Sequence, residues 1–491
     1  MKKLIALLLA LVMVLGMVAC GAKTEDAPAA DAPVADAPAA DAPAADAPVA
    51  EQVAQAEKAN DEAITVTYFC TVGAYLDILV AETDKWNATE GAEKGVYLEI
   101  TSNINSGADA IEVQMQAGNH WDIMDGASRD SWIMQGWTMD LLSIDDPELQ
   151  ALIESYMPYI EVSPDTWYGR GILPSLPLEV VPIKMAVNLD LLEAAGKTLD
   201  DIKTWEGVVE TAQAITEASN GEAWGFGLCN WGAMFRRLVM KASSSSNEKS
   251  WWDPNTQTYS FGQYEEPIEA IKTMYENGWT LGLTDLAIDP IRAEFSAGRV
   301  GMFPAPSYDY AVYTVQFPTD VNFTFVDMPV YGEDGGKYKG VWLDRANCGI
   351  DKVNFEAADD AKKQAIIDAF LFLNSDELYS AIYAQGGMIP YKQSIIESTE
   401  LQLADNVEQW AAISDTTNFT SMFLYPDGSL PLEGDTYETM FAAYVGGNLD
   451  MTWDEMVADL EERYNAAWAA GCEDPDLDLS RFTKPYDHSI G

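Results

Sequence analysis

The chain has 491 residues, of which 48% are hydrophobic and 11% aromatic. This length is too great for one hydrophobic core, so we expect two lobes, and the composition excludes disorder over most of the chain. Its 28 Lys and Arg against 79 Asp and Glu give a formal charge of −51, which should repel phosphate backbones and excludes nucleic acid as a partner.

The first twenty residues carry an export signal. Two lysines precede an apolar run over residues 4–18, and Ala19 precedes Cys20. The run is shorter than the roughly 20 residues that span a bilayer. The pattern resembles a bacterial lipoprotein signal, which predicts cleavage of residues 1–19 and a lipid on the thiol of Cys20. The protein would then be anchored in the cell membrane on its extracellular or periplasmic side; an uncleaved anchor and a soluble secreted protein are the alternatives.

Residues 20–61 are predicted to form a spacer behind the lipidated cysteine. The pentad Asp-Ala-Pro-Ala/Val-Ala repeats five times from Asp26 to Ala50. Proline in every pentad prevents a continuous helix, and alanine offers no core. Such a segment extends by about 3.1 Å per residue, so roughly 40 residues reach about 100 Å. An inert disordered stretch without a tuned length is the alternative.

Strand and helix patterns alternate from residue 62 onward. The order strand–helix–strand–helix predicts an α/β lobe with a largely parallel sheet. The predicted strands of this part are 64–69, 96–100 and 121–124, and its predicted helices are 75–87, 109–116 and 130–136.

A second strand–helix series begins near residue 182, and the C-terminal part is strongly helical. Thr452 and Glu455 form a capping box, and apolar residues follow at helical spacing as far as Trp468, which we interpret as core packing. The predicted strands here are 183–188, 299–303 and 322–326, and the predicted helices are 189–195, 204–216, 361–374, one that begins at Ser375, and the last one after Thr452.

Five segments in this order carry a family resemblance. They are Asp122-Ile123 with GWTMDL at 136–141, PLEVVPIKMAVNLDLLEAAG at 177–196, KTWE at 203–206, FSAGRVGM at 295–302, and FLFLNSDELYSAIYAQGGMIP at 370–390. Together they resemble the extracellular solute-binding proteins of carbohydrate ABC transporters, the broad family that includes maltose-binding protein. Val187 departs from the tyrosine that is common at its position. The resemblance covers about residues 62–491.

The resemblance implies a two-lobe α/β fold of the type II periplasmic-binding-protein kind, with the ligand in a cleft between the lobes. Several chain crossings would join the lobes. We expect crossings near 178–187, 300–307 and 341–350, a first lobe of residues 62–180 plus 303–345, and a second lobe of residues 181–302 plus 346–491.

A sugar site needs aromatic rings for the C–H faces and charged or amide groups for the hydroxyls. Ligands of such folds bind at the carboxyl ends of strands, so we predict contacts just past strand ends. Core packing is the alternative for each tryptophan, and an ion pair is the alternative for each arginine. The predicted ligand-binding residues are Tyr75, Asp125, Arg129, Trp132, Asn230, Trp231, Trp252, Tyr308, Trp342, Asp344 and Arg345.

We therefore expect a monomeric binding protein that passes a sugar or oligosaccharide to the permease subunits of an ABC transporter. No nucleophile-elbow, zinc-protease or phosphate-loop motif is present in the sequence, and no enzyme activity is expected. The alternatives are a surface glycan-binding lipoprotein without a transporter and a binding protein for a solute other than sugar.

No cofactor or metal is expected. The two histidines, His120 and His488, are far apart in sequence, and no CxxC pair occurs. Asp474, Asp476 and Asp478 alternate as in a calcium loop, but the glycine that such a loop needs is replaced by Leu479. We expect the cysteines after Cys20 to be mostly buried free thiols.

Overall fold

Two β-sheets with surrounding helices organise the folded part of the chain. The computed structural model describes residues 51–102, 107–160, 171–229, 239, 250–283, 286–331, 342–346, 348–403, 405–415, 425–475, 477 and 479–483. All of them belong to one unit that begins at Val49. The predicted signal peptide, Cys20 and most of the predicted spacer lie outside the described residues.

The first sheet has the strand order β1-β3-β2-β4-β13. Strand β2 is parallel to β3 and to β4, whereas the outer strands β1 and β13 are antiparallel to their neighbours. Its core strands carry β-branched and aromatic residues, which suit a half-buried pleated surface. The strands are β1 (Glu51–Gln52), β2 (Ile64–Cys70), β3 (Val96–Ser102), β4 (Ile123–Met124) and β13 (Gly349–Ile350).

The end of the predicted spacer is part of this sheet. Strand β1 pairs with β3, and the side chain of Gln55 bonds to the same strand, donating to Leu98 O at 3.3 Å and accepting from Ile100 N at 2.6 Å. The described fold therefore includes residues 51–61, which the prediction assigned to the spacer. Residues 51–53 cover the free edge of β3 by main-chain pairing, and they carry no alternating pattern that would predict it.

The second sheet has the strand order β11-β5-β10-β6-β9. Strand β6 is parallel to both β9 and β10, and β5 is antiparallel to both β10 and β11. Gly225 lets β6 approach helix α8, because a Cβ at this position would lie 2.1 Å from Ala212 O. The strands are β5 (Pro177–Asn188), β6 (Trp224–Leu228), β9 (Thr280–Gly282), β10 (Val300–Pro306) and β11 (Phe323–Asp327).

Strand β5 takes part in both halves of the fold. Its residues 177–182 pair with β12 (Trp342–Ala346) and β14 (Ile389–Pro390), whereas residues 183–188 pair with β10 and β11. All twelve residues of β5 are buried. The predicted crossing at 178–187 is therefore this strand.

The segments after β5 belong to the two sheets in a different way from the predicted lobe boundaries. Strands β10 and β11, assigned from sequence to the first lobe from residue 303, pair inside the second sheet. Residues 348–395, assigned to the second lobe, contribute to the core of the first sheet, and the later helices return to the second core. Strand pairing is decided by contacts distant in sequence, so the local pattern of a strand does not reveal its sheet.

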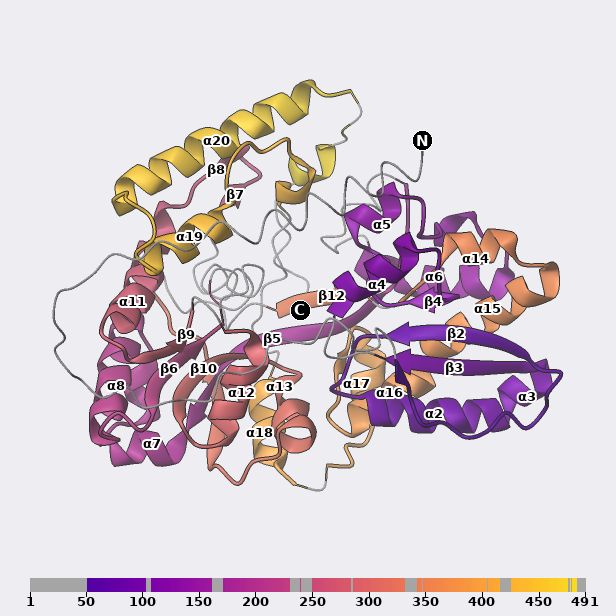
Figure 1. Ribbon diagram of the computed structural model, residues 1–491, viewed down its shortest axis with the longest axis horizontal. Helices are drawn as coiled ribbons and strands as arrows, with labels where there is room; N and C mark the ends of the chain where they lie inside the picture. Colours follow the sequence, from indigo (N-terminus) through magenta and orange to yellow (C-terminus); the bar gives the residue numbers. More distant parts are fainter. Residues whose placement is uncertain are drawn as a thin grey trace, which may run out of the picture. The chain divides into compact units, whose positions relative to one another are not determined.

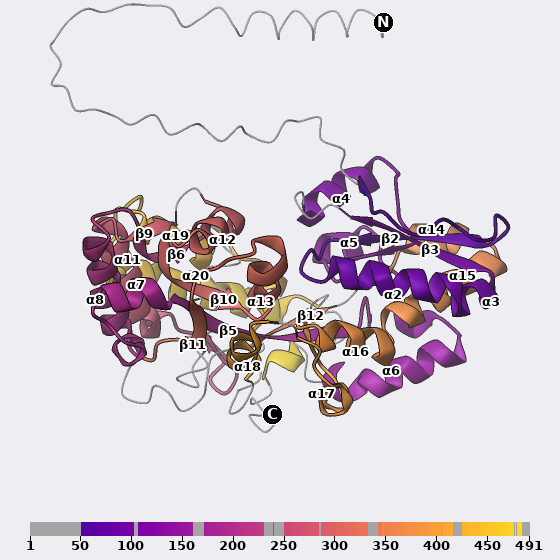
Figure 2. The same cartoon turned by 90° about the horizontal axis from the view of Figure 1, so that it is seen from below.

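Helices flank both sheets. Figures 1 and 2 show α2, α3 and α15 beside β2 and β3, and α8 beside β6. The helices of the first core are α2 (Leu76–Ala88), α3 (Glu90–Lys94), α4 (Gly107–Gln116), α5 (Asp130–Met134), α6 (Pro147–Ile160), α14 (Lys352–Ala357), α15 (Asp360–Leu373), α16 (Asp376–Ala384) and α17 (Gln393–Ser398). Those of the second are α7 (Leu189–Ala194), α8 (Trp205–Ala218), α11 (Glu265–Glu276), α12 (Ile288–Ser296), α13 (Asp309–Ala311), α18 (Val407–Ile413), α19 (Tyr437–Val445) and α20 (Trp453–Glu473).

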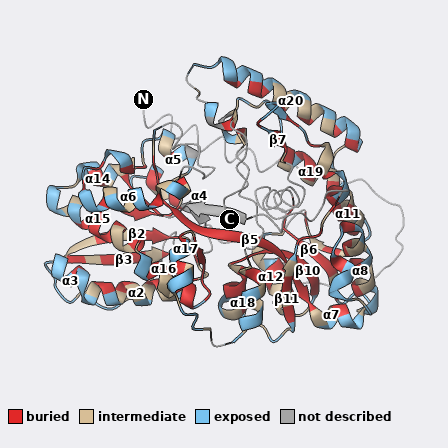
Figure 3. Cartoon of the chain, turned by 180° about the vertical axis from the view of Figure 1, so that it is seen from behind, coloured by how far each residue is buried: buried red, intermediate tan, exposed pale blue. Residues whose placement is uncertain are grey.

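Helix α20 confirms the predicted capping box and the predicted core stripe. The Thr452 side chain accepts from the backbone N–H of Glu455, and the Glu455 side chain accepts from the backbone N–H of Thr452. The stripe is buried against α19 and a hairpin of β7 (Trp252–Asp253) and β8 (Thr258–Tyr259), as the red face of α20 shows in Figure 3. Among the described helices, none has both the length and the apolar character of a membrane span.

Candidate functional site

The carboxyl ends of β2 and β4 meet at Asp125. This residue directly follows β4 and is 9% exposed. The Tyr68 hydroxyl donates to its Oδ1 at 2.7 Å, and the backbone N–H and the hydroxyl of Thr71 donate to its Oδ2 at 2.6 and 3.1 Å. Sequence position predicts Asp125 as a ligand contact, but three protein donors already engage its oxygens. Asp125 therefore fixes the loop that leaves β2, where ligand contacts are expected.

Uncharged titratable groups surround this carboxylate. Burial, followed by the charge of Asp125, raises the pKa of the Tyr68 hydroxyl well above its ordinary value. The same two causes raise the pKa of the Cys348 thiol, which directly precedes β13. Both groups therefore stay protonated near neutral pH. Three of the four described cysteines, Cys348 among them, are buried free thiols and the exposed one is Cys472, as expected from the sequence.

The other predicted ligand-binding residues at this end of the sheet differ in how far their side chains are exposed. Tyr75 is 7% exposed and packs in the first core. Trp132 is fully buried, and its Nε1–H donates to Glu112 Oε2 at 3.1 Å. Arg129 is exposed, and its guanidinium carbon lies 5.6 Å from the centroid of the Trp132 ring. Trp132 thus supports Arg129 by a cation–π contact, and the Arg129 side chain is exposed at this edge.

The carboxyl end of β10 holds a second cluster, built on Arg292 of α12. The Arg292 guanidinium forms a buried ion pair with Asp309, which follows β10 by three residues. It also pairs with Asp289 at 3.0 Å and lies 5.7 Å from the centroid of the Tyr308 ring. Tyr308, a predicted ligand residue, is half-buried. One arginine therefore holds the ring of Tyr308 and the turn after β10 in place.

Burial changes the pKa of both members of the Arg292–Asp309 pair. Burial raises the pKa of Asp309 to about 6, because the lost hydration outweighs the opposing charge of Arg292. Burial alone would lower the pKa of Arg292, but the charge of Asp309 raises it above the ordinary value. The arginine therefore stays charged, and whether the pair is ionic near neutral pH depends on whether Asp309 is protonated.

Trp252 has no surface for a ligand in this structure. It is fully buried, its Nε1–H donates to Phe482 O at 2.9 Å, and its ring centroid lies 4.4 Å from that of Trp468. Its neighbour Trp251 is also buried and donates to Asp427 Oδ2 at 2.9 Å. The core alternative applies to both rings.

Five predicted residues remain expectations. Asn230 and Trp231 lie outside the described residues. Trp342, Asp344 and Arg345 lie on β12, whose main chain pairs with β5 in the register Trp342↔Pro182, Asp344↔Val180 and Arg345↔Glu179; their side chains lie outside the described part.

The structure thus brings Tyr75, Asp125, Arg129 and Trp132 to one end of the first sheet, and Tyr308 to the corresponding end of β10. The sequence did not predict Arg292, since nothing in a nine-residue helix indicates a partner 17 residues later. Within the described ranges, no three His, Cys, Asp or Glu side chains are grouped so that they could hold a metal ion. Asp476 and Asp478 of the calcium-like pattern lie outside those ranges.

Comparison with protein families supports these observations. The profile of the bacterial extracellular solute-binding proteins matches residues 73–372. Comparison with curated proteins gave no match.

Several solved structures share the fold. An ABC transporter solute-binding protein of Thermotoga lettingae, bound with alpha-D-tagatose, has a TM-score of 0.61 and 18% identity over 83% of this chain and 100% of that chain. The GacH receptor of Streptomyces glaucescens, studied unliganded and with acarbose, has a TM-score of 0.59 and 16% identity over 83% of this chain and 99% of that one. A substrate-binding protein of Listeria monocytogenes in complex with cycloalternan has a TM-score of 0.57 and 15% identity over 83% of this chain and 98% of its own.

Proposed function

The chain belongs to the family of bacterial extracellular solute-binding proteins, and from this premise we propose that it captures a sugar or oligosaccharide and delivers it to the permease of an ABC transporter. The family match over residues 73–372 carries the proposal. The sugars bound by the similar structures support carbohydrate as the class of solute. The chain acts as a binding protein without catalysis.

The chemistry at the strand ends fits a polyhydroxylated ligand. Arg129 places an exposed guanidinium, a group that binds hydroxyl oxygens, at the end of the first sheet, and Tyr308 has a half-buried ring of the kind that packs on a C–H face. The proposed site also includes Asn230, Trp231, Trp342, Asp344 and Arg345, because they follow strand ends or lie on the strand paired with β5. Asp125 and Arg292 serve as positioning residues for the loops that carry the contacts.

Ligand binding would close the two lobes. A ligand that touches both lobes binds the closed form better than the open form, and it shifts the equilibrium by that difference in affinity. Lipid on Cys20 and the spacer after it would keep the protein at the membrane beside its permease. These statements follow the sequence pattern of residues 1–50 and the family resemblance.

A sugar screen tests the proposal. The purified protein is heated with a panel of mono- and oligosaccharides, amino acids, peptides and metal ions, and every compound that raises the midpoint of unfolding is titrated by calorimetry. We expect at least one saturable ligand that is recovered chemically unchanged. Stabilisation by amino acids, peptides or metal ions in place of all sugars would refute carbohydrate as the solute, and conversion of a sugar to products would refute a binding function without catalysis.

A further inference from the structure

The end of the predicted spacer runs along the first sheet from one end of its strands to the other. Its first residue, Glu51, pairs with Ser102 at the carboxyl end of β3. At its other end, the Lys58 ammonium donates to Thr65 Oγ1 at 3.2 Å, beside the amino end of β2. Residues 51–58, which we call the strap, therefore connect the two ends of the sheet.

Two side-chain amides complete the pairing of the β3 edge beyond β1. Asn87 of α2 accepts from Leu98 N at 2.8 Å and donates to Leu98 O at 2.9 Å. Gln55 of the strap accepts from Ile100 N at 2.6 Å and also donates to Leu98 O, at 3.3 Å. The N–H of Val53 donates to Ile100 O at 3.4 Å. Unpaired main-chain groups make an edge strand prone to join other chains, so these bonds give the strap a stable seat on β3.

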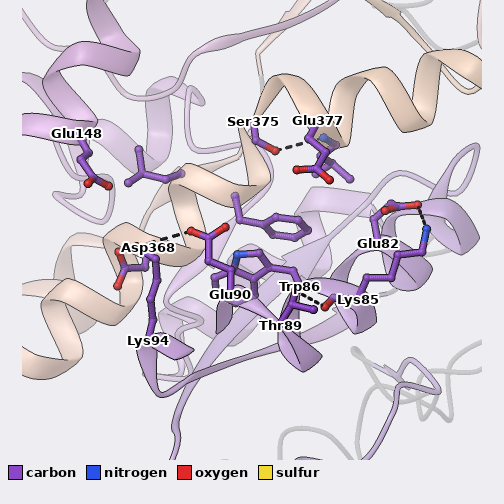
Figure 4. A pocket seen from close by; sticks show the side chains of 13 residues that line it. Glu82, Lys85, Trp86, Thr89, Glu90, Lys94, Glu148, Asp368, Ser375 and Glu377 are labelled. Carbon is purple, nitrogen blue, oxygen red and sulfur yellow. Dashed lines mark hydrogen bonds and ion pairs between the residues drawn. The ribbon is translucent and has the colours of Figure 1, made fainter. Parts of the chain in front are cut away.

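The strap is held again at Ala56. Its N–H donates to both carboxylate oxygens of Asp84 at 3.1 and 3.2 Å, and the Tyr97 hydroxyl donates to its carbonyl oxygen at 2.8 Å. Burial, followed by the charge of Asp84, raises the pKa of Tyr97 above its ordinary value, so the hydroxyl keeps the proton that it donates. Asp84 belongs to α2, whose residues Lys85 and Trp86 line a pocket with residues of α3, α6, α15 and α16 (Figure 4). One side of α2 therefore lines this pocket, and another side holds the strap.

We propose that the strap fixes the point at which the membrane tether leaves the fold. Without the strap, the tether would leave the first sheet at the amino end of β2, which begins at Ile64. With the strap, it leaves beside Ser102, at the carboxyl end of the sheet, where Asp125 and Arg129 lie. Strand β2 has 7 residues, and each residue of a strand rises by about 3.3 Å, so the two departure points are about 20 Å apart.

A fixed departure point orients a tethered protein. The strap leaves roughly 30 residues of the predicted spacer after Cys20, which reach about 90 Å at most. The end of the lobe that carries the tether therefore stays nearer to the membrane on average than the opposite end. This end holds the proposed sugar contacts, so the strap directs them toward the permease. The tether rests on the proposed lipid on Cys20 and the permease on the proposed transport function, whereas the contacts of the strap rest on neither.

Hydrogen exchange tests the contacts of the strap in the purified full chain. Gln55→Met/Tyr97→Phe keeps the size of both side chains and removes their hydrogen bonds to the edge and to the strap. We expect the Ile100 amide to exchange about tenfold faster, as for the loss of one hydrogen bond, measured by mass spectrometry with resolution of single amides. Gln393→Met, an exposed change on α17, should leave this rate unchanged. Equal rates in the double variant and the parent would overturn the strap.

Trypsin gives an independent measure of the same contacts. Lys58 is the only Lys or Arg between Lys23 and Lys85, so cleavage in the strap yields one defined product. Cleavage of a folded chain follows the population of the locally opened state. We therefore expect cleavage after Lys58 to be about tenfold faster in the double variant than in the parent or in Gln393→Met. Equally fast cleavage of all three proteins would show that the strap does not hold the tether and would overturn the proposal.

Energy transfer to a membrane tests the orientation. The lipidated protein is bound to liposomes that contain an acceptor lipid, and the exposed cysteine is removed by Cys472→Ser. A donor dye is attached through Ser131→Cys, at the site end of the lobe, or through Glu93→Cys, just before β3; both positions are exposed. We expect more transfer from position 131 than from position 93. Replacing residues 51–58 by a Gly-Ser repeat of equal length should remove or reverse this difference.

The outcomes separate the strap from the proposed function. Equal transfer from the two positions in the parent, or an unchanged difference in the Gly-Ser variant, would overturn the role of the strap in orientation. If circular dichroism shows that the Gly-Ser variant does not fold, Gln55→Met/Tyr97→Phe takes its place and should reduce the difference. Absence of the parent from the liposomes would overturn the lipid anchor and the orientation together. Failure of every sugar in the screen would count against the proposed function alone, since none of these measurements uses a ligand.

Discussion

Replacing Arg292 by methionine tests how the turn after β10 is held. The change removes the partner of Asp309, which is fully buried, while a side chain of similar length fills the space. Breaking a buried ion pair by removing one partner costs about 3–5 kcal/mol, because the remaining charge is left without compensation. We therefore expect the free energy of unfolding to fall by about 3–5 kcal/mol at pH 8, measured by urea unfolding followed by tryptophan fluorescence.

The cost of this substitution should depend on pH. Burial raises the pKa of Asp309 to about 6 from its ordinary value near 3.8. A protonated Asp309 needs no counter-charge, so Arg292→Met should cost most above pH 6 and progressively less as the pH falls toward 5. The raised pKa also means that Asp309 destabilises the parent as the pH rises through 6, because the folded state binds the proton more tightly than the unfolded chain.

Two control variants test whether the loss of stability comes from the buried charge of Asp309. Arg299→Met removes an exposed arginine that pairs with Glu294, and it should change the stability by less than about 1 kcal/mol. The double variant Arg292→Met/Asp309→Asn should recover part of the loss, since no unpaired charge remains. A cost for Arg292→Met no larger than that for Arg299→Met, or one that is independent of pH, would refute the assignment of Arg292 as the support of this turn.

Three further outcomes are expected. Cys20→Ala should move the protein from the membrane fraction to the medium or the precursor pool; unchanged mature protein in the membrane would indicate another anchor. Asp125→Ala removes the acceptor of three hydrogen bonds and should lower the free energy of unfolding by roughly 3 kcal/mol in urea, whereas an unaffected midpoint would show that the loop is held by other contacts. Trp231→Ala, Trp342→Ala and Tyr308→Ala should each weaken sugar binding about 5–30-fold in calorimetry without unfolding the protein, and parental affinity in all three would place the ligand elsewhere.

Local signals in the sequence predict local structure well. Ser375 accepts from Leu378 N at the start of α16, and Thr452 and Glu455 cap α20, both as predicted. A cap is read within four residues of sequence, so no distant contact has to be known. The strand and helix order of the first lobe was predictable for the same reason.

The direction of a side chain at a strand end was less predictable. Arg129 and Trp132 lie three residues apart at the start of α5, yet one is exposed and the other is fully buried. Arg129 is the extended residue before α5 and does not belong to the helix, so its side chain need not share the face on which Trp132 is buried. Position after a strand therefore predicts the neighbourhood of the site, while contacts such as Trp132 with Glu112 decide which residues a ligand can reach.

The ladder of β5 lacks a main-chain donor at the residue where its pairing partners change. Pro182 ends the half that pairs with β12, and Ile183 begins the half that pairs with β10. Proline has no N–H, so the ladder lacks one donor at this residue, although its carbonyl still accepts from Ser307 N at 2.9 Å. A single continuous strand thus contributes to both halves of the fold, and its ladder lacks a donor at the residue where its pairing changes from β12 to β10.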